Sequence, residues 1–146
     1  MRHALPLLAL ALLAGCGSSK HATASHYDQA KLTACLRAGA DSFARDSGVI
    51  RLNVYGEKRF ATLAEIDVAF GRTTDAAVSR LRTHYFFRTN PKAKPFVHGR
   101  YVGNVAYAIT TLPFLKKGLP GLPAARARIR ARSKRLVEGC LARARI

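Results

Sequence analysis

Two short stretches decide the fold: IRLNVY at residues 50–55 and EIDVAF at residues 65–70. In both, apolar side chains alternate with polar or small ones, which is the period of a strand with one buried face. Antiparallel strands that face a core on one side and water on the other carry this pattern. We therefore predict two half-buried strands, with Glu65 and Asp67 solvated on the outer face or paired with nearby basic side chains.

Apolar residues recur at helical spacing before and after these two strands. The first predicted helix covers residues 26–38, with Ser25 opening a capping box towards Asp28 and Gly39 as the C-terminal cap. Thr74 is predicted to cap a second helix. The last predicted helix covers residues 124–144 and turns one apolar stripe inward.

A second β-prone region follows at residues 96–111. Its central Gly103-Asn104 pair predicts a tight hairpin turn between 96–102 and 105–111, although one longer strand with a glycine kink also fits. Residues 112–123 hold three prolines and several leucines, so we expect an irregular connection. This connection either packs over the core or contacts a partner or lipid.

The order of these elements predicts an α+β fold. Helix, two strands, helix, one or two strands and helix fit a small two-layer sandwich. Its antiparallel sheet would have three to four strands, with the helices packed on one face.

The N-terminus has the layout of a secretory leader. A short basic start is followed by an apolar run over 4–13, and then by Leu13-Ala14-Gly15-Cys16. This tetrapeptide resembles the lipobox of bacterial lipoproteins, in which a leucine and two small residues precede the modified cysteine. The resemblance covers the leader alone, and the mature domain resembles no family that we can name.

The resemblance implies a cellular localisation and a domain organisation. Residues 1–15 would be a cleaved signal peptide, Cys16 would carry the lipid, residues 16–25 would form a flexible tether, and residues 26–146 one basic globular domain. Acylated Cys16 would hold the protein at the cell membrane or envelope, outside the cytoplasm. The alternative is that Cys16 is an incidental thiol beside an ordinary cleavage site.

Two cysteines remain once Cys16 is assigned to lipid. Cys35 and Cys140 lie near the two ends of the predicted domain, and an oxidising compartment favours their pairing. We therefore predict a structural disulfide, stabilising the fold by roughly 4–5 kcal/mol in the loop-entropy model.

The chain is strongly basic, with 25 Lys and Arg against 8 Asp and Glu and a formal charge of +17. Such a charge attracts polyanions, although a G+C-rich genome would also enrich arginine. The candidate anion-binding surface is the first half of the last helix: Arg126, Arg128, Arg130, Arg132, Lys134 and Arg135. Its partner would be anionic lipid, a wall polymer or an acidic protein.

No catalytic, metal or cofactor pattern stands out. His84 and His98 have no metal-ligand spacing and are interpreted as surface or sheet-edge residues. The leading hypothesis is a non-enzymatic binding or structural module of the cell envelope, without metal or cofactor. The alternatives are a small-ligand or substrate-binding enzyme domain and a nucleic-acid-binding protein, and the leader disfavours the last.

Overall fold

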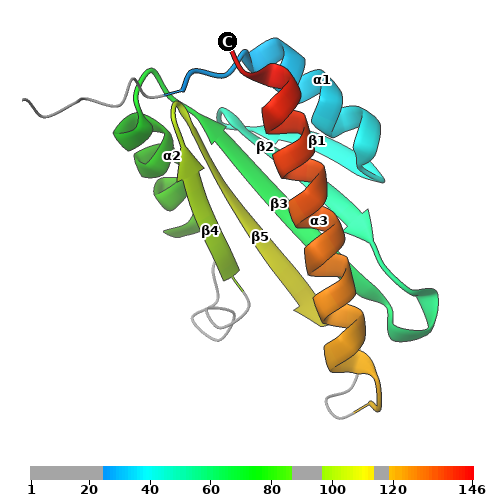
Figure 1. Ribbon diagram of the computed structural model, residues 1–146. Helices are drawn as coiled ribbons and strands as arrows, with labels where there is room; N and C mark the ends of the chain where they lie inside the picture. The colour runs from blue at the N-terminus through cyan, green and yellow to red at the C-terminus, as the bar shows by residue number, and fades with distance from the viewer. Residues whose placement is uncertain (1–24, 87–96, 114–118) are drawn as a thin grey trace, which may run out of the picture.

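The computed structural model describes residues 25–86, 97–113 and 119–146. Three helices and five strands form one layered unit (Figure 1). The helices are α1 (Gln29–Gly39), α2 (Thr74–Phe86) and α3 (Leu122–Ala144), and a short 3-10 turn, η1, covers Lys58–Phe60. The strands are β1 (Ser42–Asp46), β2 (Val49–Tyr55), β3 (Thr62–Phe70), β4 (Val97–Val102) and β5 (Val105–Pro113).

The sheet has the order β1-β2-β3-β5-β4, and every neighbouring pair is antiparallel. Because β5 lies between β3 and β4, the unit β3-α2-β4 is a split β-α-β motif. The α+β class is therefore confirmed. The predicted strand count was too low, since β1 was missed.

Both faces of the sheet are covered, which corrects the prediction of helices on one face. The alternating residues Ile50, Leu52, Ile66 and Val68 face α1 and α3 in the main core. On the opposite face, α2 packs on small side chains and forms a second core. That core contains Val49, Ala69, Ala77, Leu81, Ala106 and Ala108.

Strand β1 carries no apolar alternation that would reveal it, because it is an edge strand with three exposed residues. It pairs with β2 from Ser42↔Asn53 to Asp46↔Val49. Ser47 and Gly48 both have positive φ, as a two-residue hairpin turn requires.

The helix starts differ slightly from those predicted. Asp28, not Ser25, caps α1: its carboxylate accepts from the backbone N–H groups of Ala30 and Lys31. Thr73, not Thr74, caps α2 by accepting from the N–H of Ala76 at 3.2 Å. Gly39 is the last residue of α1, and the extended residue Ala40 ends the helix.

The predicted hairpin is confirmed, with Gly103 and Asn104 forming the turn between β4 and β5. Gly103 has a φ of +56°, and a Cβ there would lie 1.6 Å from the carbonyl oxygen of Ser25. The side chain of Asn104 also accepts from the N–H of Tyr27 at 2.8 Å and donates to its carbonyl at 3.2 Å. The start of the described chain is thus fixed to this turn.

The other end of the described chain joins the same contacts. The N–H of Asp28 donates to the carbonyl of Ala144 at 2.8 Å, and the N–H of Ile146 donates to that of His26 at 3.0 Å. We call this set the terminal clamp; it comprises His26, Tyr27, Asp28, Asn104, Ala144 and Ile146.

The disulfide is present as predicted: Cys35 on α1 and Cys140 on α3 are bonded, with Sγ atoms 2.08 Å apart. Arg143 lies beside it, with Nη1 3.8 Å from the Cys35 sulfur. The first and last helices are therefore joined covalently as well as by packing in the main core.

The predicted leader, Cys16 and most of the predicted tether lie outside the described residues. Among the helices that are described, none combines the length and apolar character needed to cross a membrane.

Candidate anion-binding groove

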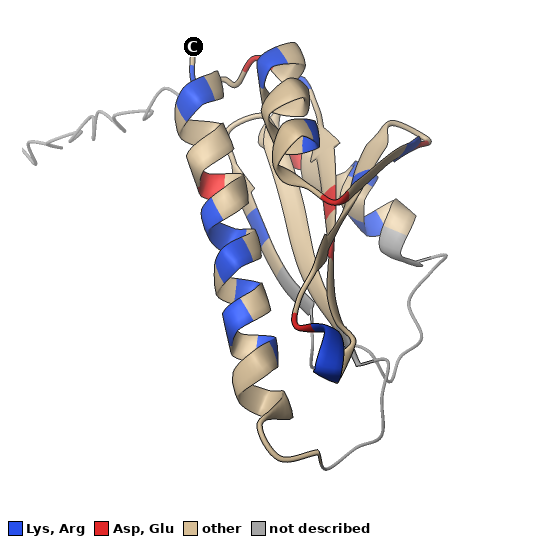
Figure 2. Ribbon diagram, turned by 90° about the vertical axis from the view of Figure 1, so that its right-hand side faces the viewer, with Lys and Arg blue, Asp and Glu red and all other residues tan. Residues whose placement is uncertain are grey.

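The buried stripe of α3 divides its cations into two rows. Ala125, Ile129, Ser133 and Val137 face the sheet and are nearly inaccessible to solvent. At helical spacing, the cations on the two sides of this stripe cannot share one face. The predicted cations therefore form two rows along α3. Figure 2 shows where Lys and Arg occur along this helix. One row is Arg128, Arg132 and Arg135; the other is Arg126, Arg130 and Lys134.

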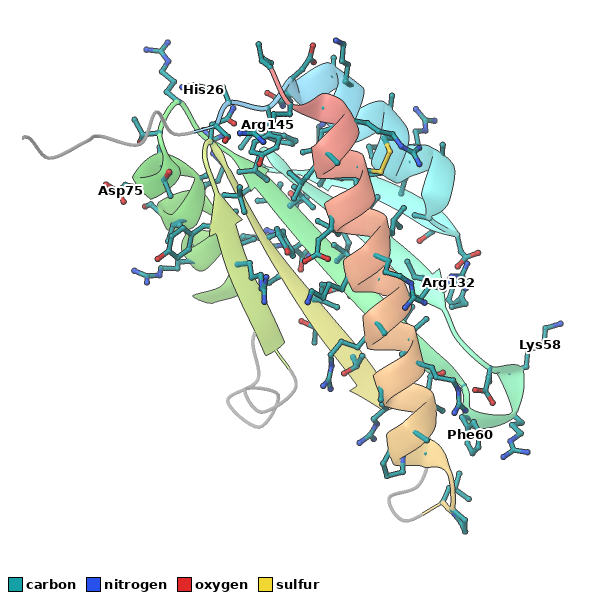
Figure 3. All side chains as sticks on the ribbon, viewed as in Figure 1. His26, Lys58, Phe60, Asp75, Arg132 and Arg145 are labelled. Atoms are coloured by element: carbon teal, nitrogen blue, oxygen red, sulfur yellow. A yellow bond between two sulfur atoms is a disulfide. The ribbon has the colours of Figure 1, made fainter. Side chains whose placement is uncertain are left out.

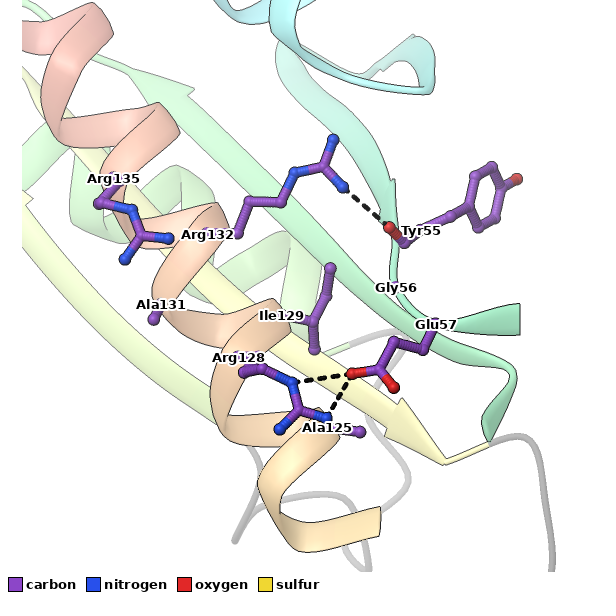
Figure 4. Close-up of a pocket in the computed structure, with 9 residues that line it drawn as sticks. All are labelled: Tyr55, Gly56, Glu57, Ala125, Arg128, Ile129, Ala131, Arg132 and Arg135. Atoms are coloured by element: carbon purple, nitrogen blue, oxygen red, sulfur yellow. Dashed lines mark hydrogen bonds and ion pairs between the residues drawn. The ribbon is translucent and has the colours of Figure 1, made fainter. Parts of the chain in front are cut away.

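The first row lines a groove between α3 and the end of β2. The groove has a volume of about 440 Å³ and is open to solvent (Figure 4). Its floor includes Ala125 and Ile129, and its far wall is the segment from Tyr55 to Glu57. The Tyr55 ring points away from α3, so this wall is largely backbone.

Two of the three arginines are held in place by the far wall. Arg128 donates from Nε to the Glu57 carboxylate at 2.8 Å, and its Nη2 contacts the same oxygen. Arg132 donates from Nη1 to the carbonyl oxygen of Tyr55 at 3.1 Å. Within the described part of the chain, no acid forms an ion pair with Arg135.

The groove is chemically suited to an oxyanion. Arginine presents a planar set of N–H donors that matches carboxylate or phosphate oxygens. Glu57 already places a carboxylate on Arg128, although this pair is about half exposed and therefore weak. An incoming anion would replace Glu57 at little cost.

The second row belongs to a different environment. Lys134 and Arg100 of β4 both lie 3.8 Å from the Glu138 carboxylate, so this side of α3 already carries its own acid. Burial, and to a lesser extent Glu138, raises the pKa of Tyr107 above its usual value. Arg126 and Arg130 are half-buried. This row is less available to an external anion.

A polar cluster that the sequence did not reveal lies on the other face of the sheet. Arg51 on β2 points its Nε at Asp67 (3.0 Å) and Glu65 (3.3 Å) of β3. The prediction of a solvated carboxylate was wrong for Asp67, which is 1% exposed because α2 covers this face. The suggested pairing with a basic side chain is confirmed.

The prediction that His84 is a surface or sheet-edge residue was also wrong, because its side chain is only 7% exposed. Its Nε2 lies 2.5 Å from Nη2 of Arg51 and 3.5 Å from Oδ1 of Asp67. His84 also lines a groove of about 620 Å³ beside Asp46 and Arg80. The side chain of His98 lies outside the described residues.

This cluster makes stability depend on pH through Glu65. Burial, followed by the charge of Asp67, raises the pKa of Glu65 above its usual value, while Arg51 opposes the shift. The folded state then binds a proton more tightly than the unfolded state. We expect stability to fall as pH rises through the interval between the unfolded and folded pKa values of Glu65.

Glu65→Gln should remove this contribution, so that the urea midpoint of the variant rises relative to that of the unmodified protein between pH 4 and neutral pH. Glu138→Gln, at an exposed position, is the control. Equal pH profiles for the Glu65→Gln variant and the unmodified protein would contradict the assignment.

Among the described residues, no three His, Cys, Asp or Glu side chains are grouped so that they could hold a metal ion. The groove itself could not be found from the sequence, since Glu57 and Arg128 are 71 positions apart.

Comparison with protein-family models, curated proteins and solved structures gave no match for this chain.

Proposed function

We propose that the protein is a lipid-anchored lipoprotein of the cell envelope, held outside the cytoplasm through Cys16, and that its groove binds an anionic partner. One observation carries the binding role: three arginines from a single row of α3 line one open groove that holds a single acid, Glu57. The resemblance to a lipobox supports the extracytoplasmic localisation, and the positive net charge of the chain supports an anionic partner.

Binding is favoured over catalysis by the chemistry of the groove lining. Arginine stays protonated at any physiological pH and cannot take up a proton from a substrate. The remaining lining is apolar or backbone, apart from the Glu57 carboxylate bound by Arg128. Such a lining attracts and orients an anion without supplying a nucleophile or a general base.

The groove is tested by replacing Arg128, Arg132 and Arg135 with Gln. The probe is a short inorganic polyphosphate of defined length, titrated against the mature chain carrying Cys16→Ser. We expect affinity to fall by roughly tenfold or more, and the slope of log K against log salt to become shallower by about two to three, since each lost phosphate contact removes about one. Isothermal titration at several salt concentrations measures both quantities.

A matched control carries Lys31, Arg45 and Arg82 replaced with Gln, all three being exposed and remote from the groove lining. It loses the same charge and should keep most of the affinity. Glu57→Gln should tighten binding, because it removes the carboxylate that competes for Arg128. If both triple variants lost affinity equally, the net charge and not the groove would be responsible.

The small-ligand or enzyme alternative is supported by a separate observation, the His84 imidazole at the edge of the second groove and beside Asp67. A ligand of that groove would be insensitive to the arginine triple variant. It would instead be lost in His84→Gln, and this difference separates the two candidates.

A further inference from the structure

We propose that the groove faces away from the bilayer that anchors the protein, and that its ligand is a linear, phosphate-bearing polymer of the extracytoplasmic space. This inference rests on the proposed function, both for the lipid on Cys16 and for anion binding in the groove. It adds an orientation and a class of partner.

The anchor must lie close to the terminal clamp. Eight residues separate Cys16 from Ser25, the first described residue, so the Cα of Ser25 lies within about 30 Å of the lipidated Cα even if the chain is fully extended. From Ser25 onwards the chain is fixed, because Tyr27 is bonded to Asn104 and Asp28 to Ala144. This end of the domain is therefore the one to which the tether would attach, and in the proposed orientation it faces the membrane.

The groove lies towards the opposite end of α3. At 1.5 Å per residue, Arg135 is about 14 Å and Arg128 about 24 Å along the helix axis from Ala144, which belongs to the clamp. His26 and Arg145 mark the clamp end in Figure 3, and Lys58 and Phe60 mark the other end. With the clamp towards the bilayer, the arginine row extends outward.

The clamp end has cations of its own for lipid head groups. Arg72, Arg143 and Arg145 are all exposed, and Asp75 is the nearby exposed acid at the start of α2. A cation close to an anionic membrane surface contributes about 1 kcal/mol. The bilayer can therefore be contacted here without the groove.

The arrangement of charges fits a linear anion better than a single small one. Along α3, Arg128 and Arg132 are separated by about 6 Å, and Arg132 and Arg135 by about 4.5 Å. Lys58 and Arg59 of η1 are exposed at this end of the molecule but do not line the groove; the Arg59 guanidinium lies over the Phe60 ring. One phosphate cannot contact Arg128, Arg132 and Arg135 together, whereas successive phosphates of a chain can.

The experiment uses the full lipidated protein in three settings: in detergent, in phosphatidylcholine vesicles, and in phosphatidylcholine vesicles containing phosphatidylglycerol. Each is titrated with the same short polyphosphate at fixed salt. We expect affinities in neutral vesicles and in detergent to agree within about twofold, and anionic vesicles to weaken binding by no more than about threefold through general repulsion. The control triple variant reports that general effect.

Other outcomes are decisive in different ways. A loss of about tenfold or more on anionic vesicles, absent from neutral ones and from detergent, would mean that the groove binds the anchoring bilayer, and the orientation would be wrong. Failure to bind polyphosphate in detergent would refute the proposed function itself. Purification of a chain without lipid on Cys16 would refute the anchor and the orientation together.

In the final part of the experiment, single-stranded DNA with the same total charge as the polyphosphate is titrated against the same protein. If DNA bound about tenfold more tightly than polyphosphate, the partner would be a nucleic acid and the polymer assignment would fall. We expect comparable or weaker binding of DNA, because the one exposed aromatic ring at the groove, Tyr55, points away from α3 and offers no stacking platform inside it.

Discussion

Replacing Cys35 and Cys140 together with Ala is expected to lower the free energy of unfolding by about 2–5 kcal/mol. The bond closes a loop of 105 residues between α1 and α3, so breaking it restores much conformational freedom to the unfolded chain. It also removes a buried contact, since Cys140 is 2% exposed and lies within the main core. For a domain of this size the midpoint of thermal unfolding should fall by roughly 10 °C or more.

Circular dichroism with and without a reducing agent measures this effect. The oxidised protein should lose stability on reduction and approach the double variant, while the double variant should not respond. A matched control is Ala34→Ser on the exposed side of α1, which should change little. A reduction-induced loss below about 1 kcal/mol would show that packing of α1 on α3 suffices without the bond.

Asp67→Ala is expected to cost about 2–4 kcal/mol, the second largest effect. Asp67 is 1% exposed and accepts from Nε of Arg51, whose side chain is only 15% exposed. Removing one partner of a buried pair leaves the other charge without compensation, which costs about 3–5 kcal/mol in fully buried cases. Glu65 stays 3.3 Å from Arg51 and reduces the loss.

Urea unfolding of three variants distinguishes pairing from volume. Asp67→Asn keeps the shape and should be destabilised less than Asp67→Ala. Adding Arg51→Met to Asp67→Leu should recover part of the stability, because the buried charge of Arg51 is removed together with that of Asp67, and only the more exposed Glu65 loses its cation. Asp46→Ala, at an exposed position on β1, is the surface control. If Asp67→Ala cost no more than Asp46→Ala, the pair would be contributing nothing.

Alternation in β2 and β3 predicted those strands correctly, but not that both faces are covered. Every residue of β3 except Glu65 is buried, including Ala64 and Ala69 on opposite faces. The sequence feature that would have indicated the second packed face is the size of the alternating side chains. In β5, Ala106 and Ala108 alternate with Tyr107 and Ile109, and small side chains are what allow α2 to approach the sheet. Alternating large and small residues therefore indicated two packed faces.

The sequence identified the cations of α3 but not the groove. Helical spacing alone separates Arg128, Arg132 and Arg135 from Arg126 and Arg130, and this division was available from the printed residues. The wall from Tyr55 to Glu57 was not, since it reaches α3 only through the order of strands in the sheet. Likewise, no local pattern relates His84 to Asp67, because α2 and β3 meet only in the folded chain.

The join between the first and last helices has a kinetic consequence. A chain that is made N-terminus first produces α1 early, with Leu32 and Leu36 exposed until α3, about a hundred residues later, can cover them. Contacts so distant along the chain form slowly and must wait for loop closure. The domain can therefore complete its fold only after the residues of α3 have been made, and until then the apolar side of α1 lacks its cover.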